Sequence, residues 1–208
     1  MKRILCFGDS NTWGYDGTTG GRFDRSVRWT GRLAQLLGSG YEIIEDGQCG
    51  RTLICESPYY GPSGCQSIEA AINRAAPVDI LIVQLGSNDL DIPYGLSASD
   101  IAAGLGIFVR KARAAAGWRT DLPEILVIVP RPIPKEAEQP SNPFFYEKGR
   151  ISSKSERLAC RMQETAELSA CESLDLDESY SVNSIDFMHL TPEGHRRLAE
   201  KLAEIILR

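Results

Sequence analysis

Three short and nearly uninterrupted apolar runs constrain the fold of this 208-residue chain most strongly. They cover residues 3–7, 79–85 and 124–129, and Gly8, Gly86 or Pro130 follows each of them directly. A strand that faces water on one side alternates apolar and polar residues, whereas a strand buried on both faces is apolar throughout. The runs therefore predict strands of a parallel sheet that is covered on both of its faces.

Segments with helical periodicity separate these strands and two further candidate strands, at 41–45 and 173–176. The expected helices cover residues 29–37, 67–75, 97–116, 152–169 and 192–207. Gly38, a capping Ser97 or Ser99, Gly117 and a proline in the first turn at Pro192 support their ends. Alternation of strands and helices predicts a three-layer α/β/α fold with a doubly wound sheet of order 2-1-3-4-5.

The chain length suits a single domain over residues 1–208. Two stretches rich in proline and glycine, near 53–66 and 131–150, fit neither pattern and are expected to be irregular loop insertions. The second insertion carries Phe144, Phe145 and Tyr146, which could cap a site or form a contact between subunits of a homo-oligomer.

The formal net charge of −5 argues against nucleic acid and against anionic membranes as partners. Basic residues from Lys148 to Arg157 alternate with polar and acidic ones, which is typical of a solvated loop and helix face. The apolar run at the N-terminus is too short for a signal peptide, and no stretch is long enough to span a bilayer, so we expect a cytoplasmic protein.

The six cysteines form no C-x-x-C pair, and the chain has only two histidines. Reduced thiols are expected, although the even number alone does not exclude disulfides. A zinc cluster is disfavoured for the same reason, so we expect no metal and no cofactor.

Polar residues follow three strands that are neighbours in the predicted order. Gly8-Asp9-Ser10 follows the first strand, Gly47-Gln-Cys-Gly50 the second, and Gly86-Ser-Asn88-Asp89 the third. Parallel strands end at one edge of the sheet, and ligands bind there at the point where the strand order reverses. The sequence thus predicts a site that combines a hydroxyl, a glycine amide and a side-chain amide.

These groups are the ones that acyl transfer requires. Ser10 can act as a nucleophile if a base takes its proton, and Asp186 lies three residues before His189, so a tight turn can pair the two side chains. Ser10 N–H, Gly50 N–H and Asn88 Nδ2 can donate to the charge that develops on an oxyanion. His195 is expected to be a packing or surface histidine.

Together these residues resemble the signature of the GDSL/SGNH hydrolase superfamily, with Ser10, Gly50, Asn88 and His189 at its four positions. The family's Asp-x-x-His block matches Asp186 to His189. The resemblance implies a flavodoxin-like α/β/α fold and a serine-dependent carboxylic ester hydrolase without a cofactor.

The opening residues 3–14, with Arg28-Trp-Thr-Gly31, are similar to the bacterial arylesterase and acyltransferase branch of that superfamily. Some members of this branch have another residue at the position of Gly50, where this chain keeps the glycine of the wider superfamily. The resemblance implies hydrolysis of short, acetyl-type esters through an acyl-enzyme, with acyl transfer to alcohols when water is excluded. Asp9, Trp13 and Cys49 are candidates for the substrate pocket.

Other functions remain open at this stage. The same machinery would serve a carbohydrate O-acetyl deacetylase, a thioesterase or a lysophospholipase. A non-catalytic flavodoxin-like binding module would share the sheet, although it would not need the five residues together. A metal-dependent hydrolase could use Asp175, Asp177 and Glu178, or Asp9 and Asp89 beside the site.

Overall fold

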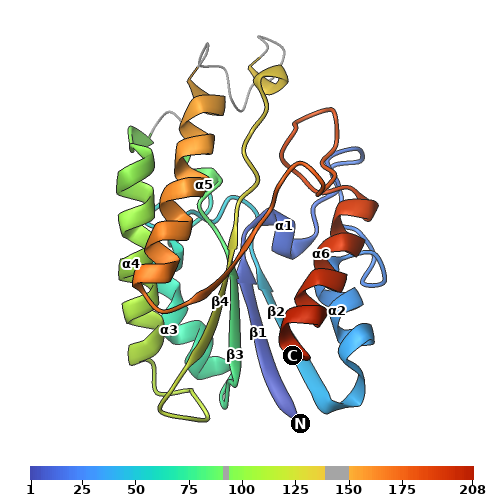
Figure 1. Ribbon diagram of the computed structural model, residues 1–208, viewed down its shortest axis with the longest axis vertical. Helices are drawn as coiled ribbons and strands as arrows, with labels where there is room; N and C mark the ends of the chain where they lie inside the picture. The colour runs from blue at the N-terminus through green and yellow to red at the C-terminus, as the bar shows by residue number, and fades with distance from the viewer. Residues whose placement is uncertain (91–93, 139–149) are drawn as a thin grey trace.

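A five-stranded parallel sheet forms the middle layer of the computed structural model, which describes residues 1–90, 94–138 and 150–208 (Figure 1). The strand order is β2-β1-β3-β4-β5, as predicted. The strands are β1 (Lys2–Gly8), β2 (Tyr41–Gly47), β3 (Ile80–Gln84), β4 (Glu124–Val129) and β5 (Glu172–Asp175).

The strands β1, β3 and β4 are mostly apolar because their alternate residues enter two different cores. In β1, Leu5 and Phe7 belong to one core, and Ile4 and Cys6 belong to the other. The central strands β3 and β4 divide their side chains between the same two cores. Burial on both faces therefore explains the runs from which the sheet was predicted.

Two helical layers supply the other halves of these cores. The helices are α1 (Ser10–Trp13), α2 (Trp29–Leu37), α3 (Gly64–Arg74), α4 (Ala98–Ala114), α5 (Ile151–Leu168) and α6 (Pro192–Ile206). Figure 1 shows α3, α4 and α5 on one side of the sheet and α2 and α6 on the other. Short 3-10 turns are η1 (Gly38–Gly40), η2 (Asn88–Leu90) and η4 (Lys135–Ala137).

The predicted start of the helix at residue 67 is wrong, because α3 begins at Gly64. Ser63 and Gln66 form a capping box in which each side chain bonds the other residue's backbone. This arrangement satisfies N–H groups that the first helical turn leaves without partners. The Ser-x-x-Gln spacing carried the signal, and the proline and glycine residues before it obscured the start.

Among the α-helices of the described residues, the short helix α1 is the one that the sequence did not predict. Asp9 caps it by accepting a hydrogen bond from the Asn11 N–H, and Gly14 ends it in the left-handed region at φ 88°. Four residues make only about one turn, so no apolar periodicity can announce such a helix. Ser97 caps α4, and Thr191 caps α6 with Pro192 in the first turn, as predicted. The predicted stop at Gly117 is wrong, because α4 ends at Ala114 with Ala115 as its C-cap.

The basic residues that were expected on a solvated face lie along α5. Arg150, Lys154, Arg157 and Arg161 line an open cavity of about 610 Å³ beside the start of α4. Arg150 and Arg157 of the predicted stretch are exposed, as predicted, whereas Lys154 is half-buried and donates to the Leu90 carbonyl at 3.1 Å. Lys148 lies outside the described residues.

Two further expectations concern the loop insertions and membranes. Phe144, Phe145 and Tyr146 lie outside the described residues. Within the described ranges, no helix is long and apolar enough to cross a membrane.

His195 is a fully buried packing residue between α6 and α2, which fits one of the two roles expected for it. The Trp29 N–H donates to its Nδ1 at 3.3 Å, and the Phe23 ring meets it edge-on at 5.5 Å. Its Nε2 has no hydrogen-bond partner within the described part of the chain. Burial, with the positive charges of Arg32 and Arg28, lowers the pKa of His195 to about 3.

We therefore expect His195 to make the protein less stable in mild acid. Below pH 6.5 the unfolded chain binds a proton at this residue that the folded protein does not bind until about pH 3. Each pH unit in that window costs about 1.4 kcal/mol of stability. Urea unfolding at pH 7.5 and pH 5.0 should show the unaltered chain losing about 2 kcal/mol relative to His195→Gln. The other titrating groups are common to both proteins, so their contributions cancel in the difference. Equal losses of stability in the two proteins would contradict the lowered pKa of His195.

Candidate active site

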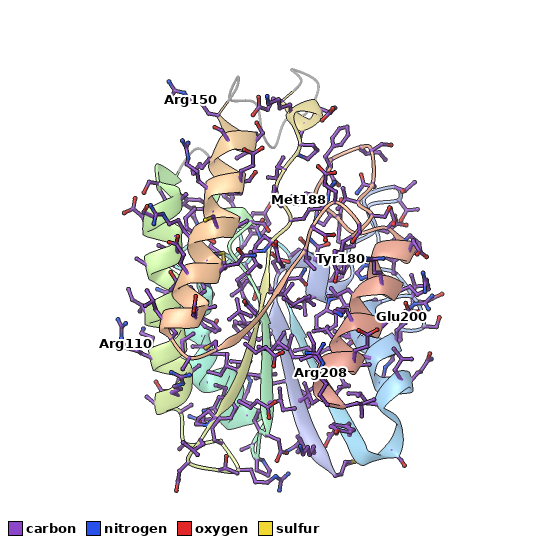
Figure 2. The ribbon with its side chains drawn as sticks, in the orientation of Figure 1. Arg110, Arg150, Tyr180, Met188, Glu200 and Arg208 are labelled. Atoms are coloured by element: carbon purple, nitrogen blue, oxygen red, sulfur yellow. The ribbon has the colours of Figure 1, made fainter. Side chains whose placement is uncertain are left out.

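The polar turns after β1, β2 and β3 meet at the carboxyl edge of the sheet, as the sequence predicted. β1 lies between β2 and β3, so Ser10 stands between the turn that contains Gly50 and the turn that contains Asn88. The loop before α6 approaches the same edge, and Figure 2 shows Met188 of that loop above the ends of the strands.

Ser10, His189 and Asp186 form one line of hydrogen bonds. His189 Nε2 lies 2.8 Å from Ser10 Oγ, and His189 Nδ1 lies 2.9 Å from Asp186 Oδ2. The three residues are 6%, 8% and 6% exposed, respectively. With Nδ1–H donated to the carboxylate, Nε2 is the atom that can accept the serine proton. The structure therefore brings together the three residues that were predicted as nucleophile, base and acid.

The Asp186 carboxylate is held by its own loop. Its Oδ1 accepts hydrogen bonds from the Met188 and His189 N–H groups at 2.9 Å each, and from Asn183 Nδ2 at 2.9 Å. Phe187 turns the chain tightly with φ 60°. Burial raises the pKa of Asp186, but these bonds and the nearby imidazole outweigh it and lower the pKa below its ordinary value. The residue is thus ionised and faces His189.

Asn183 sets the shape of this loop. Its Oδ1 accepts from the Ile185 and Asp186 N–H groups at 2.8 and 3.0 Å, and its Nδ2 also donates to the His189 carbonyl at 3.1 Å. An asparagine that bonds the backbone two residues ahead is a known turn former. The signal was present three residues before Asp186, and the sequence analysis did not use it.

Asn11 joins the nucleophile's helix to the histidine's loop. Its Oδ1 accepts from the Leu190 N–H at 2.9 Å, and its Nδ2 donates to the Met188 carbonyl at 3.3 Å. The two bonds hold the residues on either side of His189, and they thereby fix the position of His189 relative to Ser10. The residue was missed because a side chain that bonds the backbone of a distant segment leaves no local pattern.

The loop after α1 packs against both His189 and Asp186. The Tyr15 ring packs on the His189 ring with centroids 4.5 Å apart and planes at 50°. A Cβ on Gly17 would lie 2.5 Å from Asn183 Nδ2 and 2.6 Å from Asp186 Oδ2. Only a residue without a side chain fits against the carboxylate at this position.

The predicted oxyanion donors are the N–H groups of Ser10 and Gly50 and the side-chain amide of Asn88. The Ser10 and Gly50 N–H groups donate to no other residue in the described ranges. Asn88 Nδ2 donates one N–H to the Arg51 carbonyl at 3.0 Å, and its second N–H has no acceptor among the described residues. Gly50 has φ 74°, a left-handed conformation that glycine adopts without strain.

Arg51 holds the ends of two strands beneath these donors. The buried guanidinium donates to the Gly8 and Asp46 carbonyls at 3.0 and 2.6 Å and to the Asp46 carboxylate at 2.8 Å. It also lies 4.1 Å from the centroid of the Phe7 ring. Because it follows Gly50 directly, Arg51 fixes the turn that presents the Gly50 N–H. The sequence analysis did not single it out.

The other two aspartates near the site have structural contacts. Asp9, a candidate for the substrate pocket, caps α1 and is buried at 1% exposure. Asp89 accepts from the Leu53 and Ile54 N–H groups at 2.6 and 3.0 Å and anchors the loop after β2. Burial raises the pKa of each carboxyl to about 6 against these stabilising bonds.

The remaining pocket candidates, Trp13 and Cys49, are half-buried. Arg22 donates to the Trp13 carbonyl at 2.7 Å, and its guanidinium carbon lies 5.1 Å from the Trp13 ring centroid. Burial and the charge of Asp9 raise the pKa of Cys49, so its thiol stays protonated and is a poor nucleophile. All six cysteines are free thiols.

No group of three histidine, cysteine, aspartate or glutamate side chains in the described segments could hold a metal ion. The geometry near Ser10 is instead that of a hydrolase that uses a serine, a histidine and an aspartate on a three-layer α/β/α fold. The sequence agrees with this class, because residues 6–197 match the model of the GDSL-like lipase/acylhydrolase family. The chain belongs to that family and is a carboxylic ester hydrolase.

Solved structures of similar proteins agree. The native aryl esterase of M. smegmatis is 33% identical, with a TM-score of 0.87 over 100% of this chain and 99% of that one. A carbohydrate acetylesterase family member from Sinorhizobium meliloti is 29% identical, with a TM-score of 0.88 over 99% and 97% of the chains. A G-D-S-L family protein from Veillonella parvula, 15% identical with a TM-score of 0.72, shares the fold. No curated protein matches the chain.

Replacing Asn11 should reduce turnover without unfolding the protein. Asn11→Leu keeps the volume and removes both bonds to the His189 loop, and a displacement of a reacting group by about 1 Å can cost 10²-fold in rate. We expect kcat/KM for p-nitrophenyl acetate to fall by about 10- to 100-fold.

Thr12→Val is the matched control for Asn11→Leu. It removes one buried bond from the same helix, Thr12 Oγ1 to Gln84 Oε1 at 3.1 Å, which does not reach the His189 loop. This variant should lose stability and keep kcat/KM within about threefold, since one hydrogen bond contributes about 1 kcal/mol. Unchanged turnover in folded Asn11→Leu would show that Asn11 does not position His189.

Proposed function

We propose that this protein is a serine esterase that hydrolyses short-chain, acetyl-type carboxylic esters through an acyl-enzyme. The observation that carries the proposal is the line of hydrogen bonds from Ser10 Oγ through His189 to Asp186. The three residues act as a catalytic triad in which each depends on the next.

In the acylation step Ser10 Oγ attacks the ester carbonyl carbon while His189 Nε2 takes the hydroxyl proton. The carbonyl oxygen becomes an oxyanion. When it re-forms the carbonyl, the bond to the alcohol oxygen breaks and His189 returns its proton to the leaving alcohol. Asp186 holds the imidazole in the required tautomer and stabilises its protonated form.

The oxyanion is stabilised by the N–H groups of Ser10 and Gly50 and by Asn88 Nδ2. Arg51 and the Asn88–Arg51 bond hold these donors in place before the substrate arrives. Donors that are already oriented need no reorganisation when the charge develops. Their stabilisation of the oxyanion is usually the largest single contribution to catalysis of acyl transfer.

In the second half of the reaction water attacks the acyl-enzyme with His189 again acting as base, and acetate leaves. An alcohol bound in place of water would take the acyl group instead, so the same site can carry out acyl transfer. Both outcomes use the same proton path between Ser10 and His189.

The similar solved structures support the acetyl-type substrate. The aryl esterase of M. smegmatis is 33% identical and two carbohydrate acetylesterase structures from Sinorhizobium meliloti are each 29% identical to this chain. Acetylated sugars are therefore the second candidate substrates.

Labelling of the nucleophile tests the proposal. A fluorophosphonate should label Ser10, and Ser10→Ala and His189→Ala should each lower p-nitrophenyl acetate turnover by about 10⁴-fold or more. Peptide mapping locates the label, and circular dichroism checks that both variants fold. A label on another residue, or normal turnover by Ser10→Ala, would refute the triad assignment.

Removal of one oxyanion donor should slow the reaction without preventing it. Asn88→Ala is expected to lower kcat by about 10²–10³-fold while KM changes little, since the charge exists only in the transition state. Ser87→Ala, one residue away, is the control and should stay within about threefold. A change confined to KM would place Asn88 in ground-state binding instead.

A further inference from the structure

A tight hairpin at residues 57–61 lies beside the Gly50 turn. Ser57 and Gly61 exchange two backbone hydrogen bonds of 3.2 and 2.9 Å. The buried Ser57 hydroxyl accepts from the N–H groups of Tyr59 and Tyr60 at 3.2 Å each. The hairpin thereby presents two consecutive tyrosines at its tip.

The hairpin is anchored to the edge of the sheet. Gln48 Nε2 donates to the Tyr60 carbonyl, and Gln48 Oε1 accepts from the Arg51 guanidinium at 3.4 Å. Arg51 in turn bonds the ends of β1 and β2. The position of Tyr60 is therefore set by the same residues that set the Gly50 turn.

The Tyr60 ring lies directly against Gly50. A Cβ added to Gly50 would lie 2.3 to 2.5 Å from three carbon atoms of this ring, so the ring occupies the space where another residue would carry its side chain. The residue is nevertheless 51% exposed. Tyr59 is 88% exposed, and none of its atoms is among the three nearest to a Cβ on Gly50.

We propose that the Tyr60 ring is a binding subsite for a six-membered ring in the alcohol part of the ester. This inference rests on the proposed esterase function. An oxyanion bonded to the Gly50 N–H must lie within a few ångströms of Gly50, and Tyr60 is the exposed aromatic side chain that contacts this residue. Any group that extends from the reacting carbon toward the hairpin meets the ring.

The alcohol part is the one that can supply a ring. An acetyl group contributes only a methyl, so a larger apolar surface must come from the alcohol. A rigid tyrosine ring offers a large contact area at low entropic cost and favours flat partners. Its hydroxyl can also bond a polar partner, so both an aryl ring and a pyranose ring fit the same chemistry.

The test compares two esters of similar intrinsic reactivity, cyclohexyl acetate and ethyl acetate. The ratio of their kcat/KM values cancels any general loss of activity in a variant. Tyr60→Ala should lower this ratio by about 10-fold, which corresponds to the loss of an aromatic contact of about 1.4 kcal/mol. Tyr59→Ala is the matched control and should leave the ratio within twofold.

Measurements on Tyr60→Phe distinguish an aryl ring from a sugar ring as the natural partner of Tyr60. Tyr60→Phe should keep the ratio for cyclohexyl acetate, because the ring remains. The kcat/KM values for a monoacetylated methyl glucoside and for phenyl acetate are each divided by the value for ethyl acetate. If a sugar is the natural partner, Tyr60→Phe should lower the glucoside ratio and leave the phenyl ratio unchanged. Unchanged glucoside and phenyl ratios in Tyr60→Phe support an aryl partner on the same ring.

Fluorophosphonate labelling of Ser10 in each variant distinguishes failure of the Tyr60 subsite from failure of the esterase function. Normal labelling with an unchanged cyclohexyl-to-ethyl ratio in Tyr60→Ala would overturn the subsite and leave the esterase intact. Absence of labelling and of ester turnover in the unaltered chain would overturn the esterase function, and the subsite with it.

Discussion

The hydrogen bond between Ser10 and His189 joins two positions that are 179 residues apart in the chain. Neither local segment can form it alone, because the serine belongs to the turn after β1 and the histidine to the loop before α6. The sheet supplies the first position, since three parallel strands must end at one edge. Asn11 supplies the second, because its amide holds the backbone on both sides of His189. The 2.8 Å distance between Ser10 Oγ and His189 Nε2 therefore depends on the fold of the whole chain.

Three aspartates around this bond show how environment determines the state of a buried carboxyl group. Burial acts on all three and disfavours the charged form. For Asp186 the imidazole and backbone N–H groups outweigh burial and the pKa falls, whereas for Asp9 and Asp89 burial dominates and the pKa rises to about 6. The residue that must face a positively charged imidazolium is the one whose surroundings favour its charged form.

Much of the fold and the centre of the site could be predicted from the sequence. The strand order followed from apolar runs that are buried on both faces. Ser10 and Asn88 were found because strand ends meet, and His189 was found because Asp186 lies three residues before it. Residues that act through distant backbone atoms, such as Asn11 and Arg51, could not be found in this way. Their partners are carbonyl and N–H groups, which every residue carries, so the sequence contains no sign of the pairing. The start of α3 was missed for a different reason, since its capping signal was present and was given less weight than the neighbouring prolines and glycines.

The close approach of Gly17 to Asp186 has a dielectric consequence. Peptide backbone at Gly17 lies so close to the Asp186 carboxylate that a side chain has no room there, and Asp186 is only 6% exposed. A charge that is shielded from water interacts more strongly with its neighbours. The bare backbone at position 17 therefore reduces the screening of the Asp186 carboxylate by solvent and strengthens its attraction for the His189 imidazole.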